Sequence, residues 1–419
     1  MRVTAEQLRA REFRRILLIK LSAVGDVVHT IPVLNKLRRR YPNAQIDWLM
    51  TPAIAELLRH HPSISNVLLF DRERWSAPWS IPANLARLAT ELRAHNYDLV
   101  VDVHGQLRTA VLTFATAAPV RIGFPRPRAE MWTASGRTFP ANARKHAWKG
   151  AREASWLAYT HFIPVPTLDR HAVDRNLGIG PMLGLDDEPP DFSFPIPLSA
   201  QQRIDNRIGG VLPQGNPTGG SAPLLTIAPG TVWETKHWRS EGFAEVARHF
   251  MRKGFAVVLA GSKREHAVCD EVARAAPGSL NLAGETTLSD LAALIHRSTL
   301  CVTNDSGPMH LAVALNRPVV SIFGPTDEIW IGPYGRGNAV ARARLPCAPC
   351  YLRVLSRCPH DHACMRNVTA QSVIERAETI LASQGAAPSA REALLSWLEK
   401  QPIIDVGHWA RNELYEDDR

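Results

Sequence analysis

Long apolar segments are missing from this sequence of 419 residues. A helix that spans a bilayer needs about 18 or more consecutive apolar residues. The most apolar stretches, such as Phe255 to Gly261, are far shorter. The first 15 residues are polar and basic, and no apolar run leads into a small-residue cleavage site. The sequence therefore predicts neither a membrane span nor a secretion signal, and we expect a cytoplasmic protein.

Two common nucleotide-binding motifs are also absent. No glycine-rich dinucleotide fingerprint follows the first predicted strand, and no phosphate loop with Gly-Lys-Ser or Gly-Lys-Thr occurs. Cysteine is scarce, but four of the six cysteines are close in sequence: Cys347, Cys350, Cys358 and Cys364. The first pair has a spacing common in metal sites, whereas the spacing of the others is atypical. A structural zinc or iron site, reduced thiols and a disulfide are all open interpretations of this cluster.

Strands and helices alternate regularly along most of the chain. Buried strands are predicted at residues 16–19, 45–50, 98–103, 224–228, 255–260, 300–303 and 319–323. Amphipathic helices between them are typical of βαβ units in parallel sheets. A composition of 45% hydrophobic and 21% charged residues, at this length, favours two globular domains. We therefore predict an α/β protein with two Rossmann-like domains whose parallel sheets face a central cleft.

Changes in composition mark the expected domain boundaries. Proline and glycine are concentrated between Gly184 and Pro223, which predicts a linker over residues 185–223. We expect an N-terminal domain over 1–184, a C-terminal domain over 224–384 and a tail over 385–419. The periodic pattern weakens over 121–170, which predicts an insertion or a long functional loop there.

Basic charge is concentrated in the first half of the chain. Residues 1–180 hold 26 Lys and Arg against 14 Asp and Glu, while residues 181–419 hold 23 against 26. Such a bias attracts an anionic partner, which can be nucleic acid, an acidic membrane or a phosphorylated substrate. The densest stretch contains one acid, Glu130, and these bases: Arg121, Arg126, Arg128, Arg137, Arg144, Lys145 and Lys149. Anion binding and a solvated basic loop are both open interpretations of this stretch.

A carboxylate follows the first predicted strand. Gly25 permits a tight turn, and Asp26 then falls at the start of a helix predicted over residues 27–40. Aspartate is a preferred helix N-cap, so a structural role is one interpretation. The other is chemical, because open α/β sheets bind ligands at the carboxyl ends of their strands and an ionised Asp can serve as a general base.

Two loops of the second half have the composition of an anion site. After the strand at 224–228, Gly230 allows close approach to a ligand, Thr231 adds a hydroxyl and Lys236 adds a charge suited to phosphate. After the strand at 300–303, a predicted helix start contains Asp305, Ser306, Gly307 and His310. Free N–H groups at a helix start attract anions. The two loops therefore predict a diphosphate site.

In this order, the motifs resemble glycosyltransferase family 9, whose best-known members are ADP-heptose:lipopolysaccharide heptosyltransferases. The similarity covers roughly residues 14–380 and is carried by Lys20 to Asp26 and by residues 98–105, 171–175, 229–238, 304–310 and 323–327. The resemblance implies a GT-B fold with an N-terminal acceptor domain and a C-terminal nucleotide-sugar domain. It also implies inverting, metal-independent transfer of heptose from ADP-heptose to the lipopolysaccharide inner core, either Kdo-lipid A or a heptosyl core.

The resemblance also implies roles for single residues. Asp26 matches the catalytic base, Lys236 the lysine on the donor diphosphate and Thr231 a phosphate contact, while the donor-binding loop comprises Asp305, Ser306, Gly307 and His310. The expected acceptor side comprises Ser22, Gly25, Arg121, Arg128 and Lys145. The basic residues would hold an anionic lipid acceptor at the cytoplasmic face of the inner membrane. Catalysis is expected to need no cofactor, and any zinc or iron at the cysteines would be structural.

Other function classes are open alternatives. The acceptor can instead be a Ser or Thr hydroxyl of a protein, because a similar group of heptosyltransferases that modify autotransporters carries an iron-binding cysteine cluster. A non-catalytic nucleic-acid-binding protein would use the basic half and the cysteines. The basic half lacks regular aromatic interleaving, and the cysteines lack the spacing of a standard zinc finger. We therefore expect no nucleic-acid partner. A two-domain sugar epimerase would leave the Gly25-Asp26 element unexplained.

Overall fold

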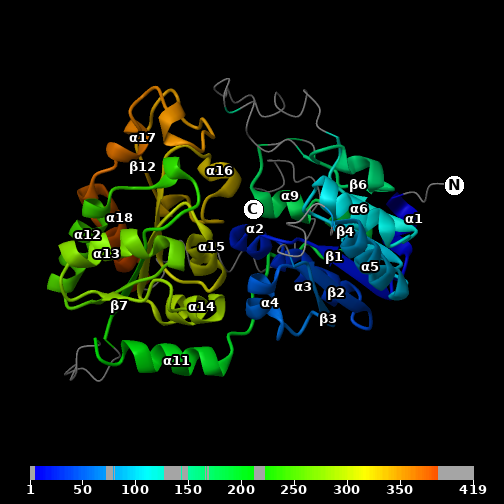
Figure 1. Cartoon of the computed structure of the whole chain (residues 1–419), viewed down its shortest axis with the longest axis horizontal. Helices are drawn as coiled ribbons and strands as arrows, with labels where there is room; N and C mark the ends of the chain where they lie inside the picture. The colour runs from blue at the N-terminus through cyan, green and yellow to red at the C-terminus, as the bar shows by residue number, and fades with distance from the viewer. Residues whose placement is uncertain are drawn as a thin grey trace, which may run out of the picture.

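The computed structural model describes residues 5–71, 79, 81–126, 143, 150–165, 167, 169–211 and 222–385. These residues form two six-stranded sheets, one in each half of the chain, and all strand pairings within them are parallel. Figure 1 shows the two units side by side, the first in blue to cyan and the second in green to orange. The predicted α/β class with two parallel, Rossmann-like sheets is confirmed.

The sheet of the first unit has the order β3-β2-β1-β4-β5-β6. Its strands are β1 (Arg15–Ile19), β2 (Gln45–Met50), β3 (Asn66–Leu69), β4 (Leu99–Asp102), β5 (Val120–Gly123) and β6 (His161–Phe162). All four residues of β4 are buried, and so is β1 after its first residue. Helices cover both faces of a parallel sheet, so its central strands are continuous apolar runs.

Helices and short 3-10 turns connect these strands. They are α1 (Ala5–Ala10), α2 (Val24–Val28), α3 (Ile31–Arg40), α4 (Pro52–Leu58), α5 (Ile81–Ala94), α6 (Leu107–Ala115), η3 (Ser155–Ala158), α9 (Ala172–Leu177) and α10 (Gly180–Leu183). The single helix predicted over 27–40 is wrong, because the chain forms α2 and then α3. Pro32 lies in the first turn of α3 and has no N–H to donate, which suits a helix start rather than an interior.

The region 121–170, predicted to be an insertion or a loop, contains part of the sheet. β5 overlaps its beginning, and β6 pairs with β5 at the sheet edge. β6 has only two residues, which is too short for a period-two pattern to show in the sequence. The prediction of an irregular segment is therefore wrong at both strands. Most of the basic stretch from residue 127 to 149 lies outside the described residues.

The second sheet repeats the strand order of the first. Its order is β12-β11-β10-β7-β8-β9. Its strands are β7 (Leu224–Ala228), β8 (Ala256–Leu259), β9 (Leu280–Asn281), β10 (Leu300–Asn304), β11 (Val319–Phe323) and β12 (Val340–Arg342). Numbered within its own unit, each sheet has the order 3-2-1-4-5-6 of dinucleotide-binding folds. In each sheet the strand order therefore reverses between the first and fourth strands.

The helices of the second unit follow the same alternation. They are η4 (Glu234–Lys236), α12 (Ser240–Arg252), η5 (Lys263–Glu265), α13 (His266–Ala275), α14 (Leu288–Arg297), α15 (Gly307–Ala314), α16 (Glu328–Ile331), η6 (Gly337–Ala339), η7 (Leu355–Arg357), α17 (Ala363–Arg366) and α18 (Ala370–Gly385). No helix among the described residues is long and apolar enough to cross a bilayer.

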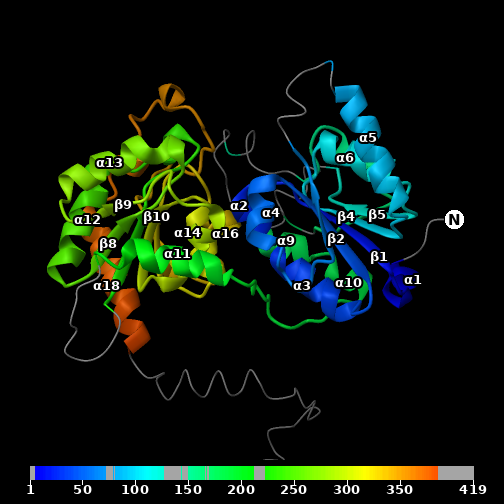
Figure 2. The same cartoon turned by 60° about the horizontal axis from the view of Figure 1, so that its bottom comes forward.

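A helix lies within the range expected to be a linker. α11 (Leu198–Ile208) buries Ala200, Ile204 and Ile208 in an apolar cluster with strand residues of the second sheet. Figure 2 shows α11 lying along the second unit, close to α14. Most of the range 185–223 is thus either part of the second unit or the extended chain that leads to it. Residues 212–221 and the predicted tail beyond 385 lie outside the described residues.

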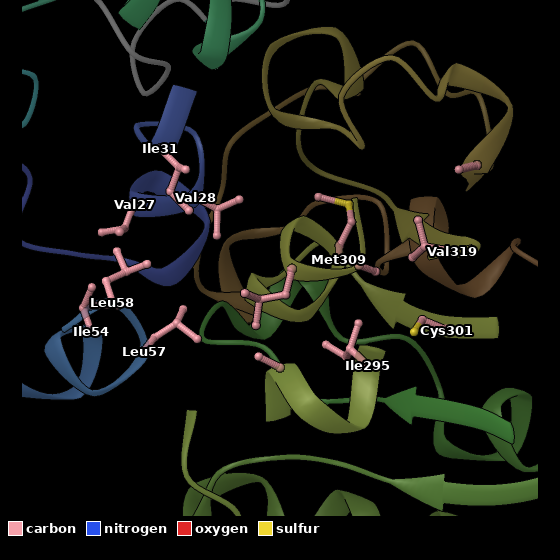
Figure 3. Packing of buried hydrophobic residues seen from close by; sticks show 14 of the residues in the cluster. Val27, Val28, Ile31, Ile54, Leu57, Leu58, Ile295, Cys301, Met309 and Val319 are labelled. Atoms are coloured by element: carbon pink, nitrogen blue, oxygen red, sulfur yellow. The ribbon is translucent and has the colours of Figure 1, made fainter. Parts of the chain in front are cut away.

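The two units pack directly against each other beside the cleft. α2 contacts α15, and α4 contacts α14. Figure 3 shows apolar side chains of the first unit facing those of the second, among them Val28, Leu57, Ile295 and Met309. The approach of α2 to α15 is close, since a Cβ added to Gly307 would lie 3.1 Å from Cβ of Val24. One continuous apolar core therefore joins the two sheets.

Candidate active site

The chain segments that carry the predicted chemistry all follow strands at the two reversal points. Residues 20–26 follow β1 and His104 follows β4, while residues 229–236 follow β7 and 305–310 follow β10. In a parallel sheet, the loops that follow the two strands at such a reversal lead to opposite faces of the sheet. They leave a crevice between them, outside the carboxyl ends of the strands. The two crevices belong to different units, and both lie at the carboxyl ends of their sheets. The topology thus explains why residues from opposite ends of the chain gather at one place.

A cavity of about 600 Å³ lies between the two units. That volume is within the usual range for pockets that hold small ligands. The first unit contributes Ala23, Val24, Gly25, Asp26 and His29 to its wall. The second unit contributes residues of the loops after β7 and β10, including Thr231, Lys236, Asp305, Ser306, Gly307 and His310. One cavity therefore brings the predicted base together with the whole predicted donor-binding set.

Asp26 occupies the first turn of α2 but is not its N-cap, which is Ala23. Its Oδ2 accepts a long hydrogen bond of 3.4 Å from the Ala23 N–H. The side chain is 54% exposed and lines the cavity. The capping interpretation is therefore correct only in part, because the carboxylate satisfies one backbone donor and still faces the cleft. Such a carboxylate is accessible to a ligand.

Several cations and dipoles influence the charge of Asp26. Removal from water works to raise its pKa, but the Lys20 ammonium, the His104 and His310 rings and the Ala23 N–H together lower it below its ordinary value. The Lys20 Nζ lies 3.8 Å from Asp26 Oδ1 and donates to the Val103 carbonyl at 3.0 Å. Asp26 is therefore ionised at neutral pH and able to accept a proton.

His104 and Arg175 also influence this wall of the cleft; both lie in segments that carry the family resemblance, but no role was predicted for either. Burial and the nearby Lys20 charge lower the pKa of His104 to about 3, so the ring is neutral. Burial lowers the pKa of Arg175 to about 10, which leaves the guanidinium charged. Its charge interacts with that of Asp26. Position could have indicated His104, which lies two residues after β4 at the reversal point.

Lys236 and Asp305 form an ion pair in the opposite wall. Lys236 Nζ lies 2.7 Å from Asp305 Oδ2, and the two side chains are only 11% and 3% exposed. The Thr326 hydroxyl donates to the same Asp305 oxygen at 2.6 Å. Lys236 Nζ also lies 4.4 Å from the centre of the Trp233 ring, a favourable cation–π distance. The Lys236 ammonium is therefore held in place at the edge of the cavity by the Asp305 carboxylate and by the Trp233 ring.

The two loops of the second unit are tied together by Asn304, the last residue of β10. Its side chain donates to the Pro229 carbonyl at 2.6 Å and accepts from the Trp238 N–H at 3.3 Å. The side chain is fully buried, so both bonds are shielded from water. Trp238 in turn donates its ring N–H to the Val368 carbonyl at 3.0 Å. The anion-binding loops are thus fixed relative to each other before any ligand arrives.

The N-terminus of α15 opens into the cavity. Ser306 is the N-cap residue, and its side chain forms no capping hydrogen bond to the helix. Pro308, in the first turn, has no N–H and suits that position. The N–H groups of a helix start, together with its dipole, form a ready site for an anion. Because Ser306 does not cap them, these backbone donors are available to a phosphate group.

Gly25 matters for a reason other than the predicted turn. It lies inside α2 and does not have a positive φ, so the turn that it was predicted to permit does not depend on it. A Cβ at this position would lie 2.3 Å from Cδ2 of His310, across the boundary between the units. His310 in turn forms a 2.9 Å hydrogen bond between its Nδ1 and Nε2 of His29. The glycine therefore allows the His310 ring to lie directly against α2.

Two of the remaining predicted site residues are described, and both lie outside the cavity wall. Ser22 lies in the turn before α2, and Arg121 donates to the backbone carbonyls of Ala118 and Ala158 at 2.6 and 2.7 Å. Neither residue lines the cavity. Arg128 and Lys145 lie outside the described residues. The acceptor roles of these four residues stay predictions.

The proposed metal site at the cysteines is not supported. Cys347, Cys350, Cys358 and Cys364 are all described and all free. Within the described part of the chain, no three or more His, Cys, Asp or Glu side chains form a group able to hold a metal ion. Burial raises the pKa of Cys364 to about 12, so its thiol is protonated in the absence of a metal. Cys364 instead packs beside Gly324, where an added Cβ would lie 3.0 Å from its sulfur.

Known proteins share both this fold and much of this sequence. The solved structures that match most of the chain include a glycosyl transferase family 9 protein from Veillonella parvula (TM-score 0.70, 22% identity, 89% of this chain and 98% of that one). They also include an Escherichia coli heptosyltransferase with ADP-2-deoxy-2-fluoro heptose (TM-score 0.62, 24% identity, 89% of this chain and 100% of that one). These likenesses bear on the fold, and they agree with the predicted GT-B architecture of two Rossmann-like units around a cleft.

The sequence comparisons identify the family. The family described as Glycosyltransferase family 9 (heptosyltransferase) matches residues 85–147 and 137–358. Lipopolysaccharide heptosyltransferase 1 of Pseudomonas aeruginosa is 31% identical over 353 residues, which cover 83% of this chain and 89% of that protein. Lipopolysaccharide heptosyltransferase 3 of Escherichia coli is 28% identical over 74% of this chain and 82% of its own length. The chain therefore belongs to glycosyltransferase family 9, the heptosyltransferases.

Proposed function

We propose that this enzyme transfers a heptose from ADP-heptose to a lipopolysaccharide core acceptor. One observation carries the proposal: a single cavity has the ionised Asp26 on one wall and Lys236 with the open start of α15 on the other. The names of the relatives, all lipopolysaccharide heptosyltransferases, support this choice of reaction. In this proposal the first unit binds the acceptor and the second unit binds the nucleotide sugar.

The two walls suit the two halves of an inverting displacement. The Asp26 carboxylate takes the proton of the acceptor hydroxyl while that oxygen attacks the anomeric carbon. On the opposite face of the sugar, the bond to ADP breaks and negative charge grows on the diphosphate. Lys236 and the N–H groups at the start of α15 stabilise that charge. They supply positive charge that a divalent cation would otherwise supply, so we expect transfer without a metal.

The acceptor is the less constrained half of the proposal. The first 180 residues hold 26 basic against 14 acidic residues, which favours a phosphorylated and carboxylated acceptor such as Kdo-lipid A. A heptosyl core and a protein hydroxyl are the alternatives. Family membership makes the chain an enzyme, which argues against the non-catalytic nucleic-acid-binding alternative. We place the reaction at the cytoplasmic face of the inner membrane, where a lipid acceptor would be reached from the cytoplasm.

The full chain incubated with ADP-heptose and Kdo-lipid A tests the proposal. We expect release of ADP and a gain in the mass of the lipid that equals one heptose, measured by mass spectrometry. Proton NMR of the product should show an anomeric configuration opposite to that of the donor. Addition of EDTA should leave the rate unchanged. If heptose is found on a protein and never on the lipid, the acceptor is a protein hydroxyl. If neither acceptor gains heptose while ADP still binds, the proposed reaction is wrong.

A further inference from the structure

The helix α6 exposes its apolar side chains and buries its polar ones. Leu107, Val111 and Phe114 follow one another at spacings of four and three residues, which places them on one face, and all three are exposed. Thr109 and Thr113 on the other side are fully buried. Thr113 donates to Asp102 at 3.4 Å, and Thr109 donates to the Gln106 carbonyl at 2.9 Å. The hydroxyl groups on the buried side of α6 are thus hydrogen-bonded, and the apolar side of the helix faces outward.

A neighbouring segment extends this apolar surface. η3 packs beside α6, and its Leu157 is 78% exposed, while Phe114 is 64% exposed. Scattered exposed hydrophobic residues are ordinary, but exposed apolar residues gathered on two adjacent elements are typical of an interaction site. We call Leu107, Val111, Phe114 and Leu157 the α6 face. In Figures 1 and 2, α6 lies well away from the second unit.

Arginines surround the α6 face. Arg108, Arg126 and Arg152 are exposed, and the guanidinium of Arg121 lies 5.7 Å from the centre of the Phe114 ring. An acidic residue next to Arg152 in the sequence, Glu153, accepts a hydrogen bond from the Leu107 N–H at 3.2 Å. Apolar side chains surrounded by cations fit the boundary between headgroups and acyl chains of an anionic membrane. A protein partner for this surface would need an apolar patch surrounded by acidic residues.

We propose that the α6 face docks on a bilayer that contains anionic lipid. The apolar side chains would enter the acyl boundary, and the arginines would pair with lipid phosphates. α6 begins three residues after His104, whose ring influences the pKa of Asp26. Docking there would set the membrane surface beside the first wall of the cleft. This inference goes beyond the proposed reaction, because vesicle binding needs neither donor nor acceptor.

Cosedimentation of the full chain with vesicles tests the docking surface. We expect binding to vesicles of phosphatidylethanolamine mixed with phosphatidylglycerol, and much weaker binding to phosphatidylcholine alone. The double variant Phe114→Ser, Leu157→Ser should bind the anionic vesicles about tenfold more weakly. Leu198→Ser is the matched control, because Leu198 is 75% exposed on α11 of the other unit. ADP binding in each variant shows that it is folded.

Two results would overturn the docking surface. Wild-type protein that does not bind anionic vesicles excludes it, and so does a double variant that binds as well as wild type. In the first case, a concentration-dependent dimer in size-exclusion chromatography that the double variant loses would show that the α6 face binds a second copy of the chain. None of these results depends on heptose transfer, so the proposed reaction is tested separately.

A separate observation concerns the two histidines that meet across the cleft. His29 and His310 are both almost fully buried, and Nε2 of His29 lies 2.9 Å from Nδ1 of His310. Burial lowers both pKa values, that of His310 to about 4, so both rings are neutral at pH 7. A neutral imidazole carries a single N–H, so one ring must donate and the other accept. The bond therefore couples the tautomers of the two rings.

The surroundings of His29 favour one direction for this bond. Nδ1 of His29 is buried and has no hydrogen-bond partner within the described structure. A buried N–H without a partner is rarer in proteins than an acceptor without one, so Nδ1 is better left unprotonated. The proton of His29 then lies on Nε2 and is donated to Nδ1 of His310. The proton of His310 must in that case be on its Nε2, beside Gly25 at the cavity wall.

We infer that His29 is a positioning residue that keeps the His310 Nε2–H available as a donor to the cavity. Its use on an oxygen of the nucleotide sugar rests on the proposed function, but the tautomer itself does not. Nitrogen-15 NMR of histidine-labelled full chain without ligand should show His310 protonated at Nε2. In His29→Phe we expect a mixture of tautomers and about tenfold weaker ADP binding. His29→Asn, which retains an N–H donor, should recover part of both.

The tautomer spectrum distinguishes positioning from a structural role. If wild-type His310 carries its proton on Nδ1, the inference is wrong whatever the activity. The same holds if His29→Phe lowers the melting temperature but leaves the His310 tautomer unchanged. Loss of transfer with the Nε2–H tautomer intact would instead count against the proposed reaction.

Discussion

The two walls of the cleft handle charge in opposite ways. On the first wall, Asp26 is half exposed and its closest cation, Lys20, lies 3.8 Å away. On the second wall, Lys236 and Asp305 lie 2.7 Å apart and are almost fully buried. A charge that is already paired and buried is well placed to orient a ligand but poorly placed to exchange a proton. A carboxylate that faces the cavity with a more distant counter-ion can take up a proton during a reaction.

This difference indicates a division of labour between the two units. The second wall is built in advance, with its loops joined by Asn304 and its ammonium fixed by Asp305 and Trp233. Such preorganisation is what stabilisation of a leaving group requires, because donors that are already in place need not reorganise during the reaction. The first wall contributes one reactive group on the short helix α2. Changes on the first wall should therefore affect turnover, and changes on the second should affect binding as well.

Asp26→Asn should have the largest effect and should separate the walls most clearly. Loss of the base is expected to lower kcat about 1,000-fold. ADP affinity should change less than about twofold, because the second wall is intact. Turnover assays and calorimetric titration with ADP measure the two quantities. Asp205→Asn is the matched control, since Asp205 is 53% exposed but lies on α11 outside the cavity wall. Near-normal turnover in Asp26→Asn would remove the catalytic assignment.

Lys236→Met should damage both binding and stability. Loss of the ammonium is expected to lower kcat/KM about 100-fold, and the unpaired Asp305 carboxylate should cost about 3 kcal/mol of unfolding free energy. Adding Asp305→Asn to this variant should restore most of the stability, measured by urea unfolding, without restoring activity. If the single and double variants are equally stable, the pair does not act as a buried ion pair.

Gly25→Ala tests the contact between the walls. A methyl group at this position would lie 2.3 Å from the His310 ring, so α2 and α15 must move apart. We expect kcat to fall about tenfold because the base shifts relative to the donor site. Gly337→Ala is the control, since no atom lies within 4 Å of a Cβ there. The variant Gly25→Ala, His310→Ala should unfold at a higher temperature than Gly25→Ala alone, and equal melting temperatures would contradict a steric cause.

A fall in pH should destabilise the contact between the two walls, and this is the smallest of the expected effects. Burial lowers the pKa of His171 and of His310 from 6.5 to about 4. The unfolded chain then binds more protons between these values, so stability is present above pH 6.5 and is lost as the pH falls toward 4. Each histidine should cost about 2 kcal/mol between pH 7 and pH 5. The melting temperature should drop by about 5 °C or more over that range.

The variant His171→Asn makes this pH test specific. His171 is the N-cap of α9, and asparagine can replace it as the acceptor for the Val173 N–H. The melting temperature of His171→Asn should depend less steeply on pH than that of wild type. An unchanged slope would mean that other groups cause the loss of stability in acid.

Strand periodicity made much of the fold predictable. All seven predicted strands correspond to observed ones within one residue at each end, because long buried runs are the strongest signal a sequence carries. Five strands were missed, and all are short: β6, β9 and β12 have two or three residues each, and β3 and β5 have four each, too few for a clear pattern. The break between α2 and α3 was missed although Pro32 indicated it. The sequence also predicted α11 as part of a linker, since its buried face became apparent only against α14.

The candidate site was predictable where a motif had a fixed order in the chain. Asp26, Lys236 and the residues from Asp305 to His310 could be singled out in this way, and the cavity brings them together. His29 could not, because nothing in its local sequence distinguishes it from an ordinary residue. His104 and Arg175 lie within the segments 98–105 and 171–175 that carry the family resemblance, but their interaction with Asp26 became apparent only in the fold. The cysteines show the reverse case: close spacing in sequence left a metal site open beside reduced thiols and a disulfide, but the fold does not arrange the side chains as a ligand set.

The sequence alone determined the two parallel sheets, the charge bias of the first half and the residue types in the loops after β1, β7 and β10. These follow from local periodicity and composition, which any fold of this chain must satisfy. Only the tertiary structure decided that Asp26 faces Lys236 across a shared cavity, and that Gly25 makes room for His310. It alone decided that α6 turns its apolar side outward. Such facts depend on how elements far apart in the chain pack together, and no local pattern records that.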